Sequence, residues 1–481
     1  MLWTRQGRRG VAAVAAALTL TLLPGAAPAS AVTRHGAARP ATGANDWDMW
    51  GYDLQRTGFN PNETTLDPSA VPGLHLDWQF PYATTSYNAP VFASGVDVDG
   101  TPTDLVYAGD NSGDFYAVNA ATGALVWSQD LGVNDSVCFG DLGVSSTATI
   151  DRATNRIYAI GGGGALYAMD LADGTIASGW PVQVTQFPNE YVWDAVAEND
   201  GELYLGVAST CDRGGTYYGR VARVNASTAA VDGNFYVTDG PDTGVSGGGI
   251  WGWGGVSVDP ATGDVFEASG NGYPNDQYEH FEYAESVVRL TKDLSVLSSD
   301  YPGLTGKDVD FGSTPILFTA KKACGQQLFV MNKDGEVLLY DADDIASGPV
   351  EALQTSAREI IGVAAYSPTD HRIYYGNPSN SPDKSYRRGL LSFRIGSDCK
   401  LKPTWSYKVK GRGLTTSPVS ADGVVYWGDS VGNELYAFDQ ATHKLIWSSG
   451  SLFTDSPRTE PIVVGGHLYI TVGSSLYAFG P

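Results

Sequence analysis

The chain has 481 residues, 42% of them hydrophobic, so it is long enough for one to three domains with a large buried core. Its formal net charge of −23 at pH 7 excludes nucleic-acid binding through a general electrostatic attraction. Aromatic residues make up 11% of the chain and glycines number 59, and no long amphipathic helical period is found. This composition favours an all-β fold.

The first 73 residues differ from the rest. Residues 1–31 have a basic start, a short apolar run and the small residues Ala29-Ser30-Ala31, as in a secretory signal peptide. The apolar run is shorter than the ~20 residues of a bilayer span, so we expect a secreted or extracytoplasmic protein with no membrane span after cleavage. Residues 32–73 are expected to form a disordered leader, the aromatic lead-in WDMWGYDLQRTGFN (47–60) and a linker.

From residue 74 onward the sequence repeats itself. The stretches LVYAGDNSGDFYAVNAATGALVW (105–127) and VVYWGDSVGNELYAFDQATHKLIW (424–447) each contain two alternating strands, a tight turn and a third strand that ends in Trp. With six weaker copies there are about eight repeats of roughly 50 residues, a length that suits four short strands. The last copy lacks its outer strand, which LHLDWQF (74–80) supplies. We therefore predict that residues 74–481 form one domain, an eight-bladed β-propeller closed by an N-terminal strand.

The four cysteines, Cys138, Cys211, Cys324 and Cys399, contain no C-x-x-C pair, which argues against a thiolate metal site. An even number in an exported chain permits two disulfides. We expect Cys138–Cys211 and Cys324–Cys399, because the members of each pair are about one to one and a half repeats apart.

The repeat phrase resembles the repeat of pyrroloquinoline quinone (PQQ) propellers, and the resemblance covers nearly all of residues 74–481. The tryptophans that look like its docking residues between blades are Trp127, Trp180, Trp405 and Trp447. This family includes quinoprotein alcohol dehydrogenases and also non-catalytic scaffolds such as outer-membrane assembly factors. The lead-in and Glu285-Ser286 resemble the polyvinyl-alcohol-dehydrogenase-like members most.

The stretch from Ser246 to Pro274 resembles the cofactor floor of these dehydrogenases. It has a Gly-rich approach, two tryptophans, an Asp-Pro turn and Gly270-Asn271, in that order. Counting back from Asp259 puts Trp253, rather than Trp251, at the floor position. The resemblance implies that Trp253 lies under PQQ and that Asn271 binds calcium, because a planar quinone needs an aromatic platform and a cation that polarises its carbonyl.

Other positions match the family less closely. Lys333, before Asp334-Gly335, resembles the cation directed at the quinone oxygens. The carboxylate that binds calcium would fall on Gly214, with Asp212 nearby, and Glu285 is the candidate catalytic base. Asp308 and Asp310 resemble an acidic segment of the family, and we favour a turn-capping role for them over contact with a cation.

Three interpretations stay open. The first is an exported oxidoreductase that uses PQQ and calcium to oxidise an alcohol or sugar and needs a separate electron acceptor, since the chain has no cytochrome segment. The alternative is a non-catalytic binding or assembly scaffold, which the lack of an adjacent cysteine pair favours. A third is a glycosidase or lyase that uses Glu279, Glu282 or Glu285.

Overall fold

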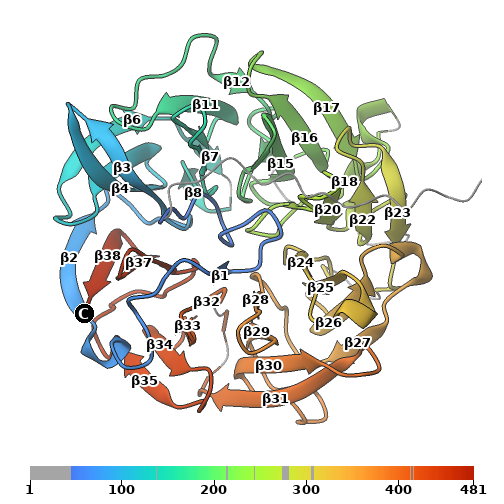
Figure 1. The fold of residues 1–481 in the computed structure, drawn as a ribbon. Helices are drawn as coiled ribbons and strands as arrows, with labels where there is room; N and C mark the ends of the chain where they lie inside the picture. The colour runs from blue at the N-terminus through green and yellow to red at the C-terminus, as the bar shows by residue number, and fades with distance from the viewer. Residues whose placement is uncertain are drawn as a thin grey trace, which may run out of the picture. The chain divides into compact units, whose positions relative to one another are not determined.

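The computed structural model describes residues 45–136, 138–212, 215–242, 244–273, 281–304, 308–411, 413–414 and 416–481. They belong to one compact unit, Ala37–Pro481. Within these ranges the chain is all-β and forms a ring of eight blades (Figure 1). The predicted signal peptide (1–31) and the start of the leader (32–44) lie outside the described residues. No helix in the described ranges has the length and hydropathy of a membrane span.

Each blade is an antiparallel sheet whose first strand is nearest the axis and whose last strand is outermost. Blades 1 to 4 consist of β3 (Val91–Val98), β4 (Thr101–Gly109), β5 (Asp114–Asn119), β6 (Leu125–Asp130); β9 (Thr149–Asp151), β10 (Arg156–Ile160), β11 (Ala165–Asp170), β12 (Val182–Gln183); β14 (Ala197–Asn199), β15 (Glu202–Ser209), β16 (Arg220–Asn225), β17 (Ala230–Tyr236); and β19 (Ser257–Val258), β20 (Val265–Ala268), β22 (Val287–Leu290), β23 (Val296–Asp300).

Blades 5 to 8 consist of β24 (Ile316–Phe318), β25 (Gln327–Met331), β26 (Glu336–Asp341), β27 (Glu351–Gln354); β28 (Ala365–Ser367), β29 (Arg372–Asn377), β30 (Gly389–Ile395), β31 (Leu401–Lys408); β32 (Val419–Ala421), β33 (Val424–Asp429), β34 (Glu434–Asp439), β35 (Leu445–Ser448); and β36 (Ile462–Val464), β37 (His467–Val472), β38 (Ser475–Gly480), β2 (His75–Pro81). Short elements connect them: β1 (Phe59–Asn60), β7 (Asn134–Ser136), β8 (Gly140–Leu142), β13 (Glu190–Tyr191), β18 (Ser246–Gly247), β21 (Gly272–Tyr273) and the 3-10 turns η1 (Val71–Gly73), η2 (Gly240–Asp242), η3 (Lys322–Cys324) and η4 (Ile345–Ser347).

The ring closes as the sequence predicts. Strand β2, from the N-terminal side, pairs antiparallel with β38, the last strand of the chain, with Leu76 opposite Phe479. Because the N-terminal strand supplies the outer strand of blade 8, a separate outer strand after Phe479 is not needed. The prediction of an eight-bladed β-propeller closed by an N-terminal strand is confirmed.

Tryptophans on the outer strands join neighbouring blades. Their indole nitrogens donate to backbone carbonyls of the next blade: Trp78 to Ala120 at 2.9 Å, Trp127 to Leu171 at 2.9 Å and Trp447 to Leu74 at 2.8 Å. The Trp78 ring lies so close to Gly123 that a Cβ there would be 2.8 Å from the ring. In blade 7 a histidine takes the place of this glycine, and Trp405 stacks on His443 with ring centroids 5.3 Å apart. The glycine of the repeated Thr-Gly turn therefore leaves room for the ring of the neighbouring tryptophan to pack against it.

Both expected disulfides, Cys138–Cys211 and Cys324–Cys399, are present in the structure. The first connects the turn between β7 and β8 to the segment that follows β15. The second connects η3 of blade 5 to the turn between β30 and β31 of blade 6.

The lead-in crosses the centre of the ring, which the sequence did not indicate. Residues 46–60, called the axial plug below, contact the inner edges of all eight blades in turn (Figure 1). Six contacts are backbone hydrogen bonds of 2.7 to 3.0 Å: Trp47 with Phe92, Asp48 with Ile150, Leu54 with Val258, Gln55 with Leu317, Thr57 with Tyr366 and Gly58 with Ser420. Two are side-chain contacts, from Arg56 to Val196 O and from Asn60 to Val463 O. The inner strands thus gain partners along their free edges.

Arg56 is the central side chain of the plug and is fully buried. Its guanidinium donates to Val256 O at 3.0 Å and Trp50 O at 2.8 Å, besides Val196 O at 3.5 Å. On the blade 8 side, buried Glu460 accepts a hydrogen bond of 2.6 Å from Gly51 N. Burial raises the pKa of Glu460 to about 8, although the hydrogen bond from Gly51 and the charge of Arg56 oppose this effect.

Candidate functional site

All five residues that the sequence singled out lie at one end of the ring. In an antiparallel meander, the start of the first strand and the turn between the second and third strands are at the same end of the blade. Trp253 precedes β19, Asn271 and Glu285 lie between β20 and β22, Lys333 lies between β25 and β26, and Asp212 lies between β15 and β16. We call this end the loop face.

Lys333 is held by two carboxylates. Its Nζ is 2.7 Å from Asp308 Oδ1 and 3.0 Å from Asp310 Oδ2, and its backbone N donates to Asp310 O at 2.9 Å. The Lys333 side chain is 16% exposed and that of Asp310 only 2%. Burial lowers the pKa of Lys333, but the two carboxylates raise it by more, so the side chain is a cation at any physiological pH. Asp308 and Asp310 thus bind the ammonium group of Lys333.

The aromatic ring beside this cation is that of Trp251. Lys333 Nζ is 6.0 Å from the centroid of the Trp251 ring, within the range of a cation–π contact. Two glycines flank the ring so closely that a Cβ would be 2.8 Å from it at Gly249 and 2.6 Å from its Nε1 at Gly270. Tyr217 packs edge-on against it, with centroids 6.2 Å apart. Gly249 and Gly270 are therefore required by the tryptophan ring itself.

Trp253 has a different neighbourhood. Its ring packs edge-on against Trp50 of the axial plug at 6.3 Å, and its carbonyl accepts a 2.8 Å hydrogen bond from Ala195 N. It lies within a turn that a hydrogen bond from Gly255 N to Gly252 O closes, just ahead of β19. Counting residues back from Asp259 does not take this turn into account, so the sequence could not tell which tryptophan meets Lys333.

Asn271 and Asp212 join the site through neighbours. The carbonyl of Asn271 accepts a 2.8 Å hydrogen bond from Gly248 N, which fixes the two ends of the glycine-rich segment together. Asn271 is 6% exposed, and its Nδ2 donates to Gly272 O at 3.4 Å. Asp212 Oδ1 accepts a 2.7 Å hydrogen bond from the hydroxyl of Tyr217, the residue that packs on Trp251. Asp212 therefore supports the tryptophan through Tyr217.

Glu285 and Asp310 both hold protons more tightly than exposed carboxylates. Burial raises the pKa of Glu285 to about 7, and the charge of Asp310 adds to this effect. Burial also raises the pKa of Asp310 to about 6, against the opposing charge of Lys333. Asp310 Oδ1 is buried and has no hydrogen-bond partner among the described residues. Two carboxyl groups that titrate near neutrality beside a fixed cation are suited to proton transfer.

These residues fit the quinone that the resemblance implies. The Trp251 indole is partly exposed, the Lys333 ammonium lies 6.0 Å from its centroid, and the unpaired Asp310 oxygen can accept a hydrogen bond. For calcium, the loop face offers the Asn271 amide, but the described residues contain no group of three or more His, Cys, Asp or Glu that could hold a metal ion. The described residues thus fit the predicted quinone better than the predicted calcium ion.

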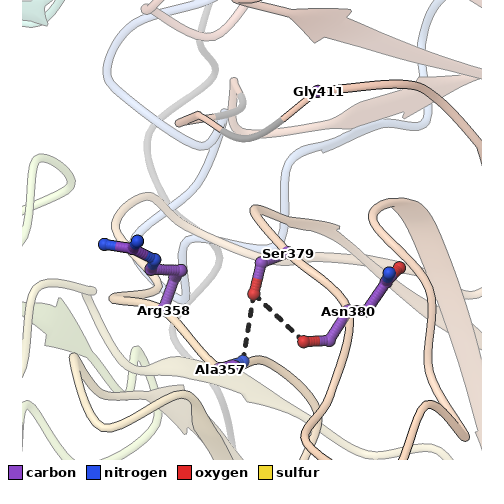
Figure 2. Close-up of a pocket in the computed structure, with 5 residues that line it drawn as sticks. All are labelled: Ala357, Arg358, Ser379, Asn380 and Gly411. Carbon is purple, nitrogen blue, oxygen red and sulfur yellow. Dashed lines mark hydrogen bonds between the residues drawn. The ribbon is translucent and has the colours of Figure 1, made fainter.

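A separate cavity opens on the loop face between blades 5 and 6 (Figure 2). It has a volume of about 400 Å³ and is lined by Ala357, Arg358, Ser379, Asn380 and Gly411. Ser379 Oγ accepts from Ala357 N at 3.0 Å and donates to Asn380 O at 3.1 Å, as Figure 2 shows. The same loop reaches the Lys333 turn, where Ile360 N donates to Asn332 O at 3.3 Å. The cavity is a polar neighbour of the site.

Comparisons with known proteins agree with this fold. Residues 36–269 match the model of the PQQ-repeat family described as outer membrane protein assembly factor BamB. The chain is 22% identical to the polyvinylalcohol dehydrogenase of a Pseudomonas species over 464 residues, and 22% identical to that of Sphingopyxis sp. (strain 113P3) over 474 residues. Each alignment covers 84% of this chain and 67% of the relative.

Among solved structures, a europium-containing methanol dehydrogenase is similar with a TM-score of 0.72 at 15% identity, covering 91% of this chain and 98% of that one. The quinohemoprotein alcohol dehydrogenase from Comamonas testosteroni is similar with a TM-score of 0.69 at 15% identity, covering 93% of this chain and 82% of that one. At this identity the likeness shows the fold alone.

Proposed function

We propose that this chain, which belongs to the PQQ-repeat family of quinoprotein alcohol dehydrogenase-like β-propellers, is an exported oxidoreductase that oxidises an alcohol on its loop face. The observation that carries the proposal is Lys333, held between Asp308 and Asp310 with its Nζ 6.0 Å from the centroid of the Trp251 ring. When bound there, PQQ would accept a hydride from the alcohol carbon. The chain would bind and orient the reactants and move the proton.

We assign the platform to Trp251 in preference to the sequence-based choice, Trp253. Trp251 is the ring beside Lys333, whereas Trp253 supports the plug side through Trp50. In this assignment Lys333 places a permanent positive charge where negative charge would develop on the quinone oxygens. Asp308 and Asp310 keep the ammonium group in position, because each forms a close ion pair with it.

The proton of the alcohol would pass to a carboxylate. Glu285 is our first candidate, because its pKa of about 7 leaves a large fraction ionised at neutral pH while its affinity for a proton stays high. Asp310, with a pKa of about 6 and a buried unpaired oxygen, is the second. Asn271 would be a calcium ligand, and Asp212, whose Oδ1 accepts a hydrogen bond from Tyr217, could join it through its other oxygen.

The substrate class we propose is an alcohol on a hydrocarbon chain, such as poly(vinyl alcohol). Two relatives that align with most of the chain are named polyvinylalcohol dehydrogenases. The two disulfides support export, because such bonds persist in oxidising compartments. Electrons would leave to a separate acceptor.

Reconstitution tests the proposal. The purified chain is incubated with PQQ and Ca²⁺, and reduction of an electron-accepting dye is followed after addition of poly(vinyl alcohol) or butan-2-ol. We expect dye reduction that depends on both PQQ and the alcohol. A chain that binds PQQ but reduces no dye with any alcohol tested would contradict the proposed activity.

One observation favours the alternative, a non-catalytic scaffold. Asp212, the carboxylate nearest the expected calcium position, is already engaged by Tyr217. A scaffold would take up no PQQ in the reconstitution, so the same experiment distinguishes the two functions.

A further inference from the structure

A second group of aromatic rings lies on the loop face outside the quinone site. Trp193 is contacted by Phe139 at 5.8 Å, Tyr87 at 6.4 Å and Tyr191 at 5.0 Å between ring centroids. Phe139 is 60% exposed, and two more apolar side chains in the neighbouring loops, Phe187 and Val133, are 56% and 41% exposed. We call Tyr87, Phe139 and Trp193 the aromatic clamp. Exposed apolar groups gathered in one place mark a binding surface more often than chance.

The clamp and the Trp251 platform flank the same strand end. The indole nitrogen of Trp193 donates to Ser209 O, the last residue of β15, at 2.8 Å. On the other side, a Cβ added to Gly249 would be 2.8 Å from the Trp251 ring and 3.0 Å from the side chain of Ala208. Because Ala208 and Ser209 are consecutive, the two aromatic groups are neighbours across the end of β15.

The clamp is built to stay in place. The hydroxyl of buried Tyr191 donates to Gly143 O at 2.8 Å and lies 2.7 Å from Ser145 Oγ, so the tyrosine ring that packs on Trp193 is fixed in place. Phe139 follows Cys138, whose disulfide to Cys211 ties the β7–β8 hairpin to blade 3. Asn134 Nδ2 of the same hairpin donates to Pro188 O at 3.0 Å. An exposed ring held by a disulfide loses little conformational entropy when it binds a ligand.

The charge around the clamp narrows the class of ligand. Asp135 and Asp141 are paired across the hairpin beside Phe139, and both are exposed. Two carboxylates repel an anionic chain but accept hydrogen bonds from hydroxyl groups. The aromatic faces and edges take methylene and methine groups. Together they suit an uncharged chain that alternates hydrocarbon with hydroxyl groups.

We propose that the aromatic clamp binds a neutral, polyhydroxylated hydrocarbon chain next to the platform and so delivers a polymeric alcohol to the reaction site. This inference rests on the proposed function for its substrate. In it, Phe139 and Trp193 set the preference for long chains over small alcohols, and neither takes part in the chemical step.

Affinity electrophoresis tests the clamp without any turnover. The chain migrates through gels that contain increasing concentrations of poly(vinyl alcohol), and retardation gives Kd. We expect Phe139→Ala to weaken Kd roughly three- to tenfold, the range for loss of one aromatic contact. The matched control is Leu125→Ala, which removes a side chain that is 51% exposed on the outer strand of blade 1 and should leave Kd unchanged. Trp193→Leu should weaken binding further.

A kinetic measurement on the PQQ-loaded protein separates the clamp from the reaction. Phe139→Ala should raise KM for poly(vinyl alcohol) by a similar factor and leave kcat/KM for butan-2-ol unchanged. A wild-type chain that the polymer does not retard, or a Phe139→Ala variant with the wild-type Kd, would overturn the clamp. If the wild type is retarded but oxidises no alcohol, the clamp stands and the proposed dehydrogenase activity fails.

Discussion

The axial plug and the loop face are built on opposite principles. The backbone of the plug bonds to the first strands of the blades in the centre of the ring, and its arginine, Arg56, donates to backbone carbonyls. The loop face instead places carboxylates, a lysine and an unpaired buried oxygen together. The backbone of the plug is paired blade by blade, as a structural core requires, although Trp50 Nε1 is buried without a hydrogen-bond partner among the described residues. The loop face, in contrast, holds charged and unpaired side-chain groups that a bound ligand could engage, as a reaction site does.

Residues other than glycine with positive φ occur both in the plug and at the loop face. Two carboxylates of the loop face, Glu285 and Asp308, have φ angles of +52° and +56°, a region that residues other than glycine seldom adopt. In this structure the two conformations bring carboxylates into the site. Within the plug, Arg56 also has a positive φ, of 60°, and its guanidinium donates hydrogen bonds to three backbone carbonyls.

The substitution that we expect to cost the most stability is in the axial plug. Arg56→Met would leave the carbonyls of Val256, Trp50 and Val196 buried without their donor. We expect a loss of about 3 to 5 kcal/mol in the free energy of unfolding, as for removal of one partner from a buried charged network. Urea denaturation measures it. Arg394→Met, at an exposed arginine that donates to Asp370 O, is the control and should change stability little.

The corresponding change at the loop face should affect turnover. Lys333→Met removes the cation beside Trp251, and we expect kcat to fall about 100- to 1,000-fold in PQQ-loaded protein, a typical cost of losing one electrostatic donor. Lys333→Arg keeps the charge and should recover part of the rate. A Met variant with wild-type kcat and unchanged PQQ content would show that Lys333 has no part in the reaction.

Glu460, which accepts a hydrogen bond from Gly51 of the plug, makes the stability of the folded chain depend on pH. Its pKa is about 8 in the folded chain against 4.5 for an exposed glutamate, because burial outweighs the hydrogen bond from Gly51. The folded chain therefore binds this proton more tightly than the unfolded chain. The contribution of Glu460 to stability is complete below pH 4.5 and is lost as pH rises through 8.

Replacement by Gln should remove this dependence. We expect Glu460→Gln to be more stable than wild type above pH 8, by on the order of a few kcal/mol. The difference in free energy of unfolding between the two proteins should become smaller at acidic pH, where Glu460 is protonated. Urea midpoints at several pH values between 5 and 9 give the comparison. Parallel curves for the two proteins would mean that Glu460 is not the group that titrates. Glu434→Gln, near the surface of blade 7, is a suitable control.

The smallest and most selective effect concerns the base at the loop face. If Glu285 accepts the proton, kcat/KM of the PQQ-loaded protein should rise with pH through an inflection near 7 and then level off, since the ionised form is the active one. Glu285→Gln should lower the rate and remove this inflection. An inflection near 6 that survives in Glu285→Gln and disappears in Asp310→Asn would assign the base to Asp310.

The sequence predicted the repeating parts of the molecule well, because each blade is specified locally. Strand alternation, the Thr-Gly turn and the tryptophan that rests on it recur within about 50 residues, so Trp127 and Trp447 could be assigned from the repeat alone. The disulfides followed from the same spacing. The axial plug was not predictable, since its partners come from every blade and depend on the closed ring.

The loop face was predictable only in outline. The sequence identified Lys333 and the glycine-tryptophan stretch, but not that Asp308 and Asp310 bind Lys333, because a short acidic segment caps turns as readily as it pairs with a cation. It named Trp253 as the platform, whereas the ring beside Lys333 is that of Trp251; which ring lies under a quinone remains a prediction. The roles of Glu285, Asn271 and Asp212 remain predictions that require a bound cofactor.

The amount of PQQ that the chain binds tests the proposed quinone site most directly. Wild type, Trp251→Ala and Trp253→Ala would each be incubated with PQQ and Ca²⁺, freed of excess cofactor and analysed by mass spectrometry. We expect one PQQ per wild-type chain, little or none in Trp251→Ala, and retention in Trp253→Ala if that variant stays folded. A folded wild-type chain that binds no PQQ would contradict the account.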